Sequence, residues 1–192
     1  DSNNTHSKKQ ANKAEACDST TSTARRGNEI RLFFWMGITR HSGAAMSPNE
    51  LQAFLHQNIP ASAALGICVN ESTPEQVVLC APIARNCNHH HTVFGGSIAL
   101  LATLCGWSLV HLRYPESGGR IVIQESSIRY LKPAVADLSA VCTPDDAAAW
   151  AACTQALAQR GKGRITLACR LYSKGVLAAE FEGKYVVFAK ET

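Results

Sequence analysis

The stretch GGSIALLATLCGWSLVHL, which spans residues 95–112, decides most of what the sequence predicts about the fold. Its apolar residues are spread around the whole circumference of a helix instead of forming one stripe. A helix of this kind is stable only when other parts of the protein surround it. We therefore expect a long central helix that is buried on nearly all sides and that opens with two glycines.

The segments around this helix predict shorter helices and about six strands. The sequence SPNE at residues 47–50 is a capping box that starts a helix, and Pro60 ends it. The sequence TPDD at residues 143–146 supplies an N-cap, a first-turn proline and two acids for a helix that runs to about residue 159. Runs of alternating or β-branched apolar residues predict the strands, which cover 65–69, 76–81, 121–131, 138–142, 165–172 and 176–188.

This order of elements is typical of an α+β fold rather than of alternating βαβ units. An antiparallel sheet of about six strands, curved by its native twist, covers the central helix from one side. The remaining sides of the helix need loops or a second copy of the chain. We therefore expect a homodimer, with a tetramer as the larger alternative.

The composition predicts a globular domain at residues 46–192 after a disordered or non-domain extension at residues 1–45. Of the 192 residues, 46% are hydrophobic and 18% are charged. The formal net charge of +4 resides mainly in the extension, and the nearly neutral remainder lacks the basic footprint of a nucleic-acid-binding protein. No uninterrupted apolar run approaches the roughly 18 residues of a spanning helix, so we expect no membrane insertion.

The eight cysteines have no CxxC spacing, and most of them lie inside apolar runs such as Gly66-Ile67-Cys68-Val69. Free cysteines that pack as small core residues show this pattern. We therefore expect reduced thiols, and with them a cytoplasmic protein.

The segment NHHHTVFGGS, residues 88–97, runs from a polar loop into the first turn of the central helix. Amides of a first turn lack intrahelical acceptors and carry partial positive charge, and glycines let a ligand approach the backbone closely. A thioester carbonyl suits such a trap, because the amides of Gly95 or Gly96 can hold the charge that develops on its oxygen. No metal site is expected, since only His89 and His91 of the extended loop point the same way and no third ligand has zinc spacing.

Three features together resemble the hotdog-fold thioesterases, which hydrolyse esters of CoA or acyl carrier protein. They are the spacing Asn-x6-Gly-Gly before a buried helix, the sequence IRYLKP at residues 128–133, and Gly163-Arg164 on the penultimate strand. The resemblance covers residues 46–190 and is closest to the thioesterase-like domain that follows an acetyltransferase-like domain in some bacteria. It implies a hotdog fold, a hydrolase without cofactor, Asn88 as the residue that positions water or the thioester carbonyl, and the Gly95 amide as oxyanion donor.

The sequence departs from the family pattern at residues that activate water. Phe94 stands where the family has His, His91 where it has Gly, and Thr103 where it has an acid on the helix. Because residues 86–114 contain no carboxylate, a carboxylate nucleophile or base on this helix is excluded. The candidates to orient a water are Thr103, Asn88 and His91, with Glu125, Ser126 or Ser127 on the next strand as a second source.

A second group of residues has the chemistry to bind an acyl thioester. A serine at the helix start suits a backbone or carbonyl partner, a tryptophan on the buried helix suits an acyl tunnel, and cations suit the phosphates of CoA or phosphopantetheine. Core packing, an interface ion pair and a solvated loop explain the same residues without a ligand. The candidates are Ser97, Trp107, Ser126, Arg129, Arg160, Lys162 and Arg164.

The sequence leaves three functions open. We expect a hydrolase of fatty acyl thioesters carried by CoA or by acyl carrier protein. The missing helix acid also allows a non-catalytic module that binds acyl chains or acyl carrier protein. A third alternative, a dehydratase of 3-hydroxyacyl thioesters, pairs a His with an acid, and that acid would have to come from Glu125.

Overall fold

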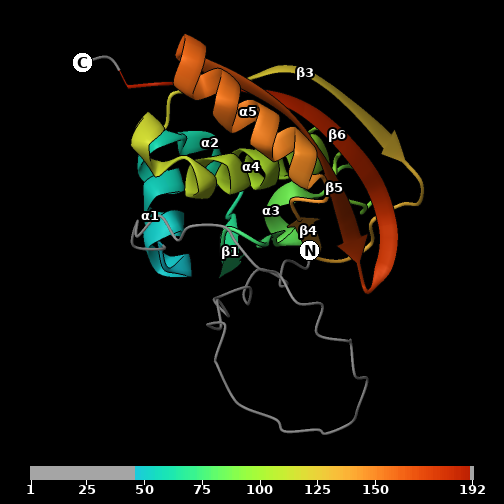
Figure 1. Cartoon of the computed structure of the whole chain (residues 1–192). Coiled ribbons are helices and arrows are strands. Elements are labelled where there is room, and N and C mark those ends of the chain that lie inside the picture. Colours follow the sequence, from blue (N-terminus) through green and yellow to red (C-terminus); the bar gives the residue numbers. More distant parts are fainter. Residues whose placement is uncertain (1–45, 191–192) are drawn as a thin grey trace, which may run out of the picture. The chain divides into compact units, whose positions relative to one another are not determined.

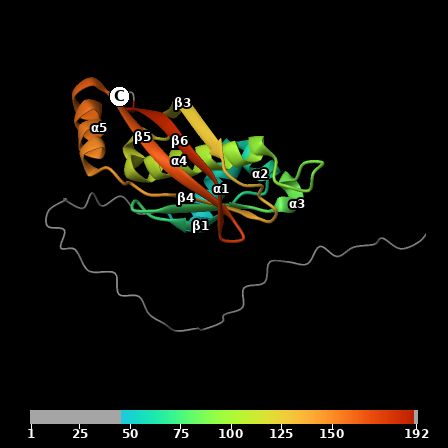
Figure 2. The ribbon, with the colours of Figure 1, turned by 90° about the vertical axis from the view of Figure 1, so that its right-hand side faces the viewer.

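A computed structural model describes residues 46–190, and the extension expected at residues 1–45 lies outside the described residues. Six strands form one antiparallel sheet in the order β1-β2-β4-β5-β6-β3. Figures 1 and 2 show the helix α4 inside the curve of the long strands. The elements are α1 (Pro48–Asn58), α2 (Pro60–Ala64), β1 (Cys68–Ser72), β2 (Val77–Ala81), α3 (Ile83–Asn86), α4 (Gly95–Arg113), the 3-10 helix η1 (Pro115–Ser117), β3 (Ile121–Tyr130), β4 (Leu138–Cys142), α5 (Ala147–Arg160), β5 (Lys162–Ser173) and β6 (Val176–Phe188).

The helix α4 is the core of the domain, as the sequence predicts. Ten of its 19 residues are buried, and it packs against β2, β3, β4, β5 and β6. Among the described helices, α4 alone is long and apolar enough to cross a membrane by length and composition, which a buried core helix also satisfies. The predicted six-stranded antiparallel sheet around a buried central helix is confirmed.

The middle of α4 lies very close to β6 at Gly106. The hydroxyl of the fully buried Tyr185 donates to the carbonyl of Thr103 at 2.9 Å. The Tyr185 ring fills the space that a Cβ at position 106 would occupy, so glycine permits this approach. Burial raises the pKa of Tyr185 well above its ordinary value. The tyrosine therefore stays neutral and fastens the helix to the sheet.

Two element boundaries differ from the prediction for identifiable reasons. The capping box at residues 47–50 is confirmed. The helix α5 begins later than expected, because Asp146 rather than Thr143 caps it: the Asp146 carboxylate accepts from the Ala149 amide at 2.9 Å. The strand β1 begins at Cys68 rather than at residue 65, because residues 60–64 form the additional helix α2.

The strand β3 lies at an edge of the sheet and, in the described chain, pairs only with β6. Eight of its ten residues are exposed, and one edge of the strand has no partner strand in the described chain. A bulge between Ile123 and Glu125 shifts the register. Beyond the bulge, alternation along the strand gives two sets of side chains: Ser126, Ile128 and Tyr130 lie on the face of α4, and Glu125, Ser127 and Arg129 lie on the opposite face.

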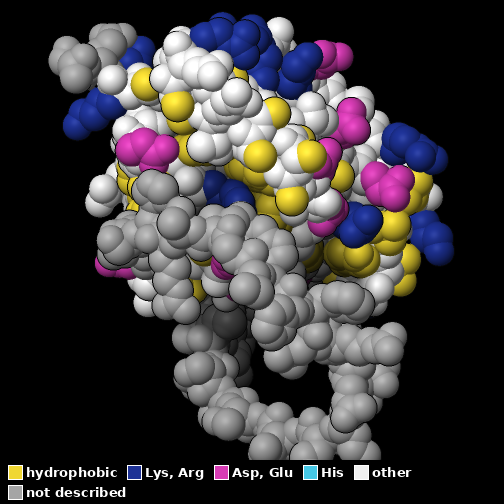
Figure 3. Space-filling model, in the orientation of Figure 1, with side chains coloured by type: hydrophobic (Ala, Val, Ile, Leu, Met, Phe, Trp, Pro, Cys, Tyr) yellow, Lys and Arg dark blue, Asp and Glu magenta, His cyan; other side chains and the backbone are white. Residues whose placement is uncertain are grey.

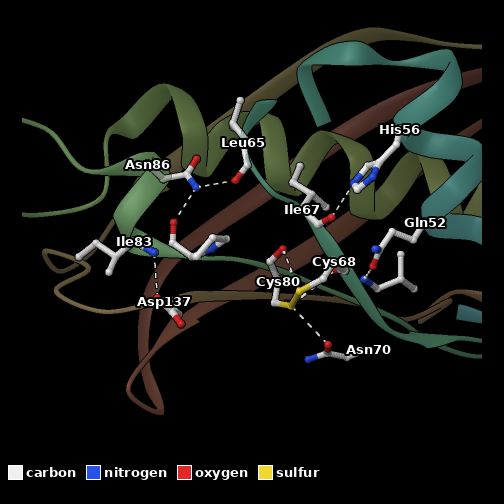
Figure 4. The surroundings of a disulfide bond; sticks show 12 residues. Gln52, His56, Leu65, Ile67, Cys68, Asn70, Cys80, Ile83, Asn86 and Asp137 are labelled. Atoms are coloured by element: carbon white, nitrogen blue, oxygen red, sulfur yellow. Dashed lines mark hydrogen bonds between the residues drawn. A yellow bond between two sulfur atoms is a disulfide. The ribbon is translucent and has the colours of Figure 1, made fainter. Parts of the chain in front are cut away.

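A disulfide joins Cys68 of β1 to Cys80 of β2, 12 residues apart in sequence. The two residues are direct partners in the antiparallel register, and both are half-buried, while their neighbours Val69 and Leu79 are buried in the core. Figure 4 shows the bond between the two strands below α1. The expectation that the cysteines are reduced core thiols is therefore wrong for this pair, because alternate residues of a hairpin face away from the core.

The remaining cysteines of the described chain are free. Cys105, Cys142, Cys153 and Cys169 are buried, as expected for small core residues, whereas Cys87 is exposed. Cys17 lies outside the described residues. Because one disulfide is present, cysteine usage no longer supports a reducing compartment, and the cytoplasmic location stays a prediction.

Candidate active site

The helix α4 begins without a side-chain cap. Phe94 is its N-cap residue, in extended conformation, and it makes no side-chain capping bond. The amide of Ile98 donates to the Phe94 carbonyl at 3.1 Å. The amides of Gly95, Gly96 and Ser97 precede this bond, so they have no acceptor within the helix. They carry the partial positive charge of the helix dipole and point ahead of the helix.

A cavity of about 490 Å³ lies beside this helix start. The glycine turn forms one wall, and the end of β3 with the loop after it forms another. Among the described residues that line it there is no carboxylate or imidazole, and Lys132 alone is charged. The cavity thus combines free amides with apolar and hydroxyl side chains. Its lining consists of Thr92, Val93, Gly95, Gly96, Ile98, Tyr130, Leu131, Lys132, Pro133 and Ala134.

The end of β3 contacts the glycine turn directly. The hydroxyl of Tyr130 donates to the carbonyl of Gly95 at 3.0 Å. A Cβ at position 95 would lie 3.3 Å from the Tyr130 hydroxyl oxygen, closer than most Cβ atoms come to a neighbour. Gly95 therefore allows Tyr130 to reach the first turn of α4. The motif IRYLKP contains Tyr130, but the sequence alone predicts no role for it.

The loop before α4 is organised around Asn88. Its side-chain oxygen accepts from the amides of His90 and Thr92 at 2.9 and 3.3 Å, and its Nδ2 donates to the Thr92 hydroxyl at 3.1 Å. Asn88 does not line the cavity itself, but its partner Thr92 does. His91 is exposed, with φ of +58°, and also lies outside the lining. Among the described residues no group of three or more metal-binding side chains comes together.

Asn86, which the sequence analysis did not single out, ties the site to the disulfide-bonded hairpin. It is 2% exposed. Its Nδ2 donates to the carbonyls of Leu65 at 2.9 Å and Pro82 at 2.8 Å, as Figure 4 shows. Its main-chain carbonyl accepts from the Phe94 amide at 2.8 Å. Asn86 thus connects the residues before β1 and after β2 to the N-cap of α4.

The predicted catalytic residues are only partly brought together. Gly95 and Gly96 line the cavity, whereas Asn88 does not line it but is bonded to Thr92, which does. Thr103 lies two turns further along α4, where its hydroxyl donates to the Ala99 carbonyl at 2.9 Å. Their assignment as catalytic residues stays a prediction, and Thr92 is the additional hydroxyl that the fold places in the cavity.

The predicted substrate-binding residues are spread over the domain. Ser97 follows the glycine pair in the first turn of α4. Ser126 lines a separate cavity of about 190 Å³ together with Glu125 and Glu182. Arg129 pairs with Glu180 at 3.5 Å on the exposed face of the sheet. Within one chain, therefore, Ser97 is the nearest of these residues to the free amides.

The predicted cations lie at the far end of the sheet. Lys162 is the first residue of β5 and lies beside the end of β6. The same end of β6 pairs with Ile121, the first residue of β3, whereas the cavity lies at the last residue of β3. The ten residues of β3 separate the two ends by roughly 30 Å. Figure 3 shows Lys and Arg side chains gathered at the top of the view, where α5 ends in Figure 1. Arg160, Lys162 and Arg164 therefore do not line this cavity, and their role in binding stays a prediction.

Trp107 also lies far from the glycine turn, and packing accounts for it. Its Nε1 donates to the Ile121 carbonyl at 3.1 Å, and its ring stacks on His111, which stacks in turn on Phe54. His111 is 8% exposed, and its Nδ1 is buried with no hydrogen-bond partner in the described chain. Burial lowers the pKa of His111 below its ordinary value of 6.5, so the ring is neutral at pH 7.

Comparison with known proteins identifies the family. The model of the family described as "Putative thioesterase (yiiD_Cterm)" matches residues 48–189. This chain belongs to that thioesterase family. The match spans every described strand and the helices from α1 to α5. The family resemblance expected from the glycine pair and the sequence IRYLKP is thereby confirmed.

Solved structures of other thioesterases share the fold of this thioesterase family member. A "putative thioesterase" from Shewanella oneidensis is 34% identical, with a TM-score of 0.64 over 73% of this chain and 96% of that chain. A "probable thioesterase" from Pseudomonas aeruginosa is 26% identical, with a TM-score of 0.65 over 77% and 100% of the two chains. A thioesterase from Haemophilus influenzae, 16% identical, matches with a TM-score of 0.60 over 76% and 94%. The predicted hotdog fold is confirmed.

Proposed function

We propose that this protein hydrolyses an acyl thioester whose carbonyl lies in the cavity at the start of α4. The observation that carries the proposal is the uncapped first turn, whose free amides at Gly95 and Gly96 border the cavity. The cavity adds apolar walls from Val93, Ile98 and Leu131 beside these donors. An ester with a polar carbonyl and an apolar acyl chain matches both surfaces.

Hydrolysis at this site follows from where the charge develops. Water adds to the carbonyl carbon, and the oxygen becomes negatively charged in the tetrahedral intermediate. Amide donors of Gly95 and Gly96 stabilise this charge, and one such donor is worth about 3–4 kcal/mol in comparable sites. The C–S bond then breaks to give a carboxylic acid and a free thiol.

The attacking water is held on the loop side of the cavity. Thr92 lines the cavity, and its hydroxyl bonds to Asn88, which fixes the orientation of that hydroxyl. Asn88 therefore acts through Thr92 in this proposal, as a positioning residue rather than by touching the substrate. Thr103 contributes less, because its hydroxyl is bonded to a carbonyl of its own helix.

The carrier of the acyl group is anionic. Lys132 is the only charged residue in the described lining, so a positive charge lies at the cavity. A phosphate of CoA or of the phosphopantetheine of acyl carrier protein complements this charge. Neutral thioesters that lack the phosphate lack this interaction.

Two copies of the chain pair through the open edge of β3. Antiparallel pairing centred on Ser127 places Glu125 of each copy opposite Arg129 of the other and brings Ile123 beside Leu131, both of which are exposed in the single chain. This register matches opposite charges and covers apolar side chains near the cavity. The homodimer supports the cavity wall, and the tetramer is an alternative outcome of the size measurement.

The dimer is tested with cysteine pairs at the proposed two-fold axis. In a Cys87→Ser background, Ser127→Cys is expected to form a disulfide-linked dimer on mild oxidation, while Val122→Cys, also exposed on β3, is not. Light scattering of Arg129→Glu should show dissociation, and adding Glu125→Arg should restore the dimer. Crosslinking of Val122→Cys alone would exclude this register, and a monomeric wild type would exclude the dimer.

The hydrolase is tested with acyl-CoAs of increasing chain length, by release of free thiol. Gly95→Pro removes the amide at a first-turn position that tolerates proline, and Phe94 before it is already extended. Gly95→Ala is the matched control, since it adds a similar Cβ beside Tyr130 but keeps the amide. We expect Gly95→Pro to be about 100-fold slower than Gly95→Ala. Equal rates would remove the Gly95 amide from the mechanism, and no turnover by the wild type would refute hydrolysis.

Binding without turnover is the second candidate function. The observation that favours it is the lack of carboxylate and imidazole in the described lining, which leaves water without a strong base in one chain. Calorimetry with a non-hydrolysable acyl-CoA and with acylated carrier protein selects this function if binding is tight while thiol release is zero. The same lining gives the dehydratase alternative no support, because dehydration needs both groups.

A further inference from the structure

We propose that Tyr130 is a positioning residue that holds the amide donors of Gly95 and Gly96 in place for the reacting carbonyl. The inference rests on the proposed thioester hydrolysis and assigns a role to a side chain on a different element, the last residue of β3. Its hydroxyl donates to the Gly95 carbonyl at 3.0 Å. The Tyr130 ring also lines the cavity, so the bond lies at the site itself.

The bond acts on the donor through a shared peptide unit. The carbonyl of Gly95 and the N–H of Gly96 belong to the same plane, and in a trans peptide they point in opposite directions. A hydrogen bond that fixes the Gly95 carbonyl therefore fixes the direction of the Gly96 N–H. The bond also polarises the peptide unit, which makes its N–H a stronger donor.

The glycine turn needs such a support because glycine is flexible. Two consecutive glycines lose more conformational freedom on folding than any other pair of residues. Asn86 holds the preceding residue, because its carbonyl accepts from the Phe94 amide at 2.8 Å. Tyr130, at the end of β3, holds the next peptide by donating to the Gly95 carbonyl. The Tyr130 hydroxyl can approach this closely because Gly95 has no Cβ. The first turn is thus bonded on both sides.

Tyr130 differs from a tyrosine that only packs. In the single chain the residue is 52% exposed, so packing within the chain contributes little to its position. Tyr185 provides the comparison within the same protein: its hydroxyl donates to another carbonyl of α4, that of Thr103, at 2.9 Å, but its ring is fully buried and outside the cavity. A hydroxyl that only stabilises the fold lowers Tm when it is removed, and we expect this for Tyr185. A hydroxyl that positions the amide donors lowers kcat when it is removed, and we expect this for Tyr130.

The test compares Tyr130→Phe with Tyr185→Phe in the full chain. Each variant loses one hydroxyl that bonds to a carbonyl of α4. We expect Tyr130→Phe to lower kcat for acyl-CoA hydrolysis about 3- to 10-fold with little change in KM or Tm, as one lost hydrogen bond implies. We expect Tyr185→Phe to lower Tm while kcat in the folded protein stays within about twofold.

A binding measurement gives a readout that does not depend on turnover. Two unreactive CoA analogues of equal chain length are used, a ketone that keeps the carbonyl and a thioether that lacks it. We expect Tyr130→Phe to weaken binding of the ketone and to leave binding of the thioether unchanged.

Equal losses for both analogues, or an unchanged kcat in Tyr130→Phe, would overturn the positioning role. If the wild type hydrolyses no thioester, the hydrolase function fails, and the difference between ketone and thioether still decides the role of Tyr130.

Discussion

The disulfide between Cys68 and Cys80 yields a prediction that separates this structure from a chain with reduced thiols. The perturbation is the double substitution Cys68→Ser/Cys80→Ser, or reduction of the native protein with dithiothreitol. Both residues are half-buried on the side of the hairpin away from the core. Reductant therefore reaches them, and serine fits in the same space without entering the apolar interior.

The magnitude follows from the loop that the bond closes. The two cysteines are 12 residues apart in sequence, and the chain-entropy relation for a loop of this length gives about 3 kcal/mol at 25 °C. In a domain of this size, 1 kcal/mol corresponds to about 2–4 °C in Tm. We therefore expect the loss of the bond to lower Tm by about 6–12 °C, with the secondary structure unchanged below the transition.

The assay is thermal unfolding followed by circular dichroism, with and without reductant. Cys87→Ser is the matched control, because it removes an exposed free cysteine and should leave both Tm and its sensitivity to reductant unchanged. The double variant should have a lower Tm than the wild type in oxidising buffer, and in reducing buffer the Tm of the wild type should fall to that of the double variant. Transitions of wild type and double variant that agree within about 2 °C in oxidising buffer would show that the bond is absent in solution or carries none of the stability assigned to it.

Three further predictions concern the site and the core. Asn88→Ala should lower kcat for acyl-CoA hydrolysis at least about tenfold, equivalent to about 1.4 kcal/mol, because Thr92 loses the partner that orients it; an unchanged rate would remove the loop from the mechanism. Asn86→Ala should cost about 1–3 kcal/mol of stability by denaturant unfolding, since the buried Asn86 amide donates to two part-buried carbonyls that lose their donor, while Asn58→Ala, which removes one exposed local bond, should cost less. Because burial lowers the pKa of His111, the unfolded state binds a proton as pH falls below 6.5 while the folded state does not. The free energy of unfolding should therefore fall from pH 7 to 5 more steeply in the wild type than in His111→Phe. Parallel pH profiles of the two proteins would contradict this.

The fold was largely accessible from the sequence because hydrophobic burial determines it. The apolar circumference of residues 95–112 required an enclosing sheet, and the structure has one. The pattern of apolar residues did not predict which residues of neighbouring strands pair with each other. Cys68 and Cys80 become neighbours only through the register of β1 and β2, so their disulfide follows from turn geometry rather than from either apolar run.

Only the part of the candidate site that is formed by main-chain amides could be predicted from the sequence. Gly95 and Gly96 were recognised because two glycines at the start of an apolar helix leave amides free. Residues that act on that turn from elsewhere were not recognised: Asn86 bonds through its own main chain and Tyr130 reaches the turn from β3, 35 residues away. Long-range bonds to carbonyls leave no periodic signal in a sequence.

The oxyanion site that we propose at the start of α4 does not depend on the side chain of Thr103. The Thr103 hydroxyl donates to the Ala99 carbonyl, one turn back in α4. The amides of the glycine turn come from the backbone, and only a substitution by proline, as in Gly95→Pro, deletes one of them. In the function that we propose, Thr92 and Asn88 therefore orient the water, since the described lining of the cavity contains no carboxylate.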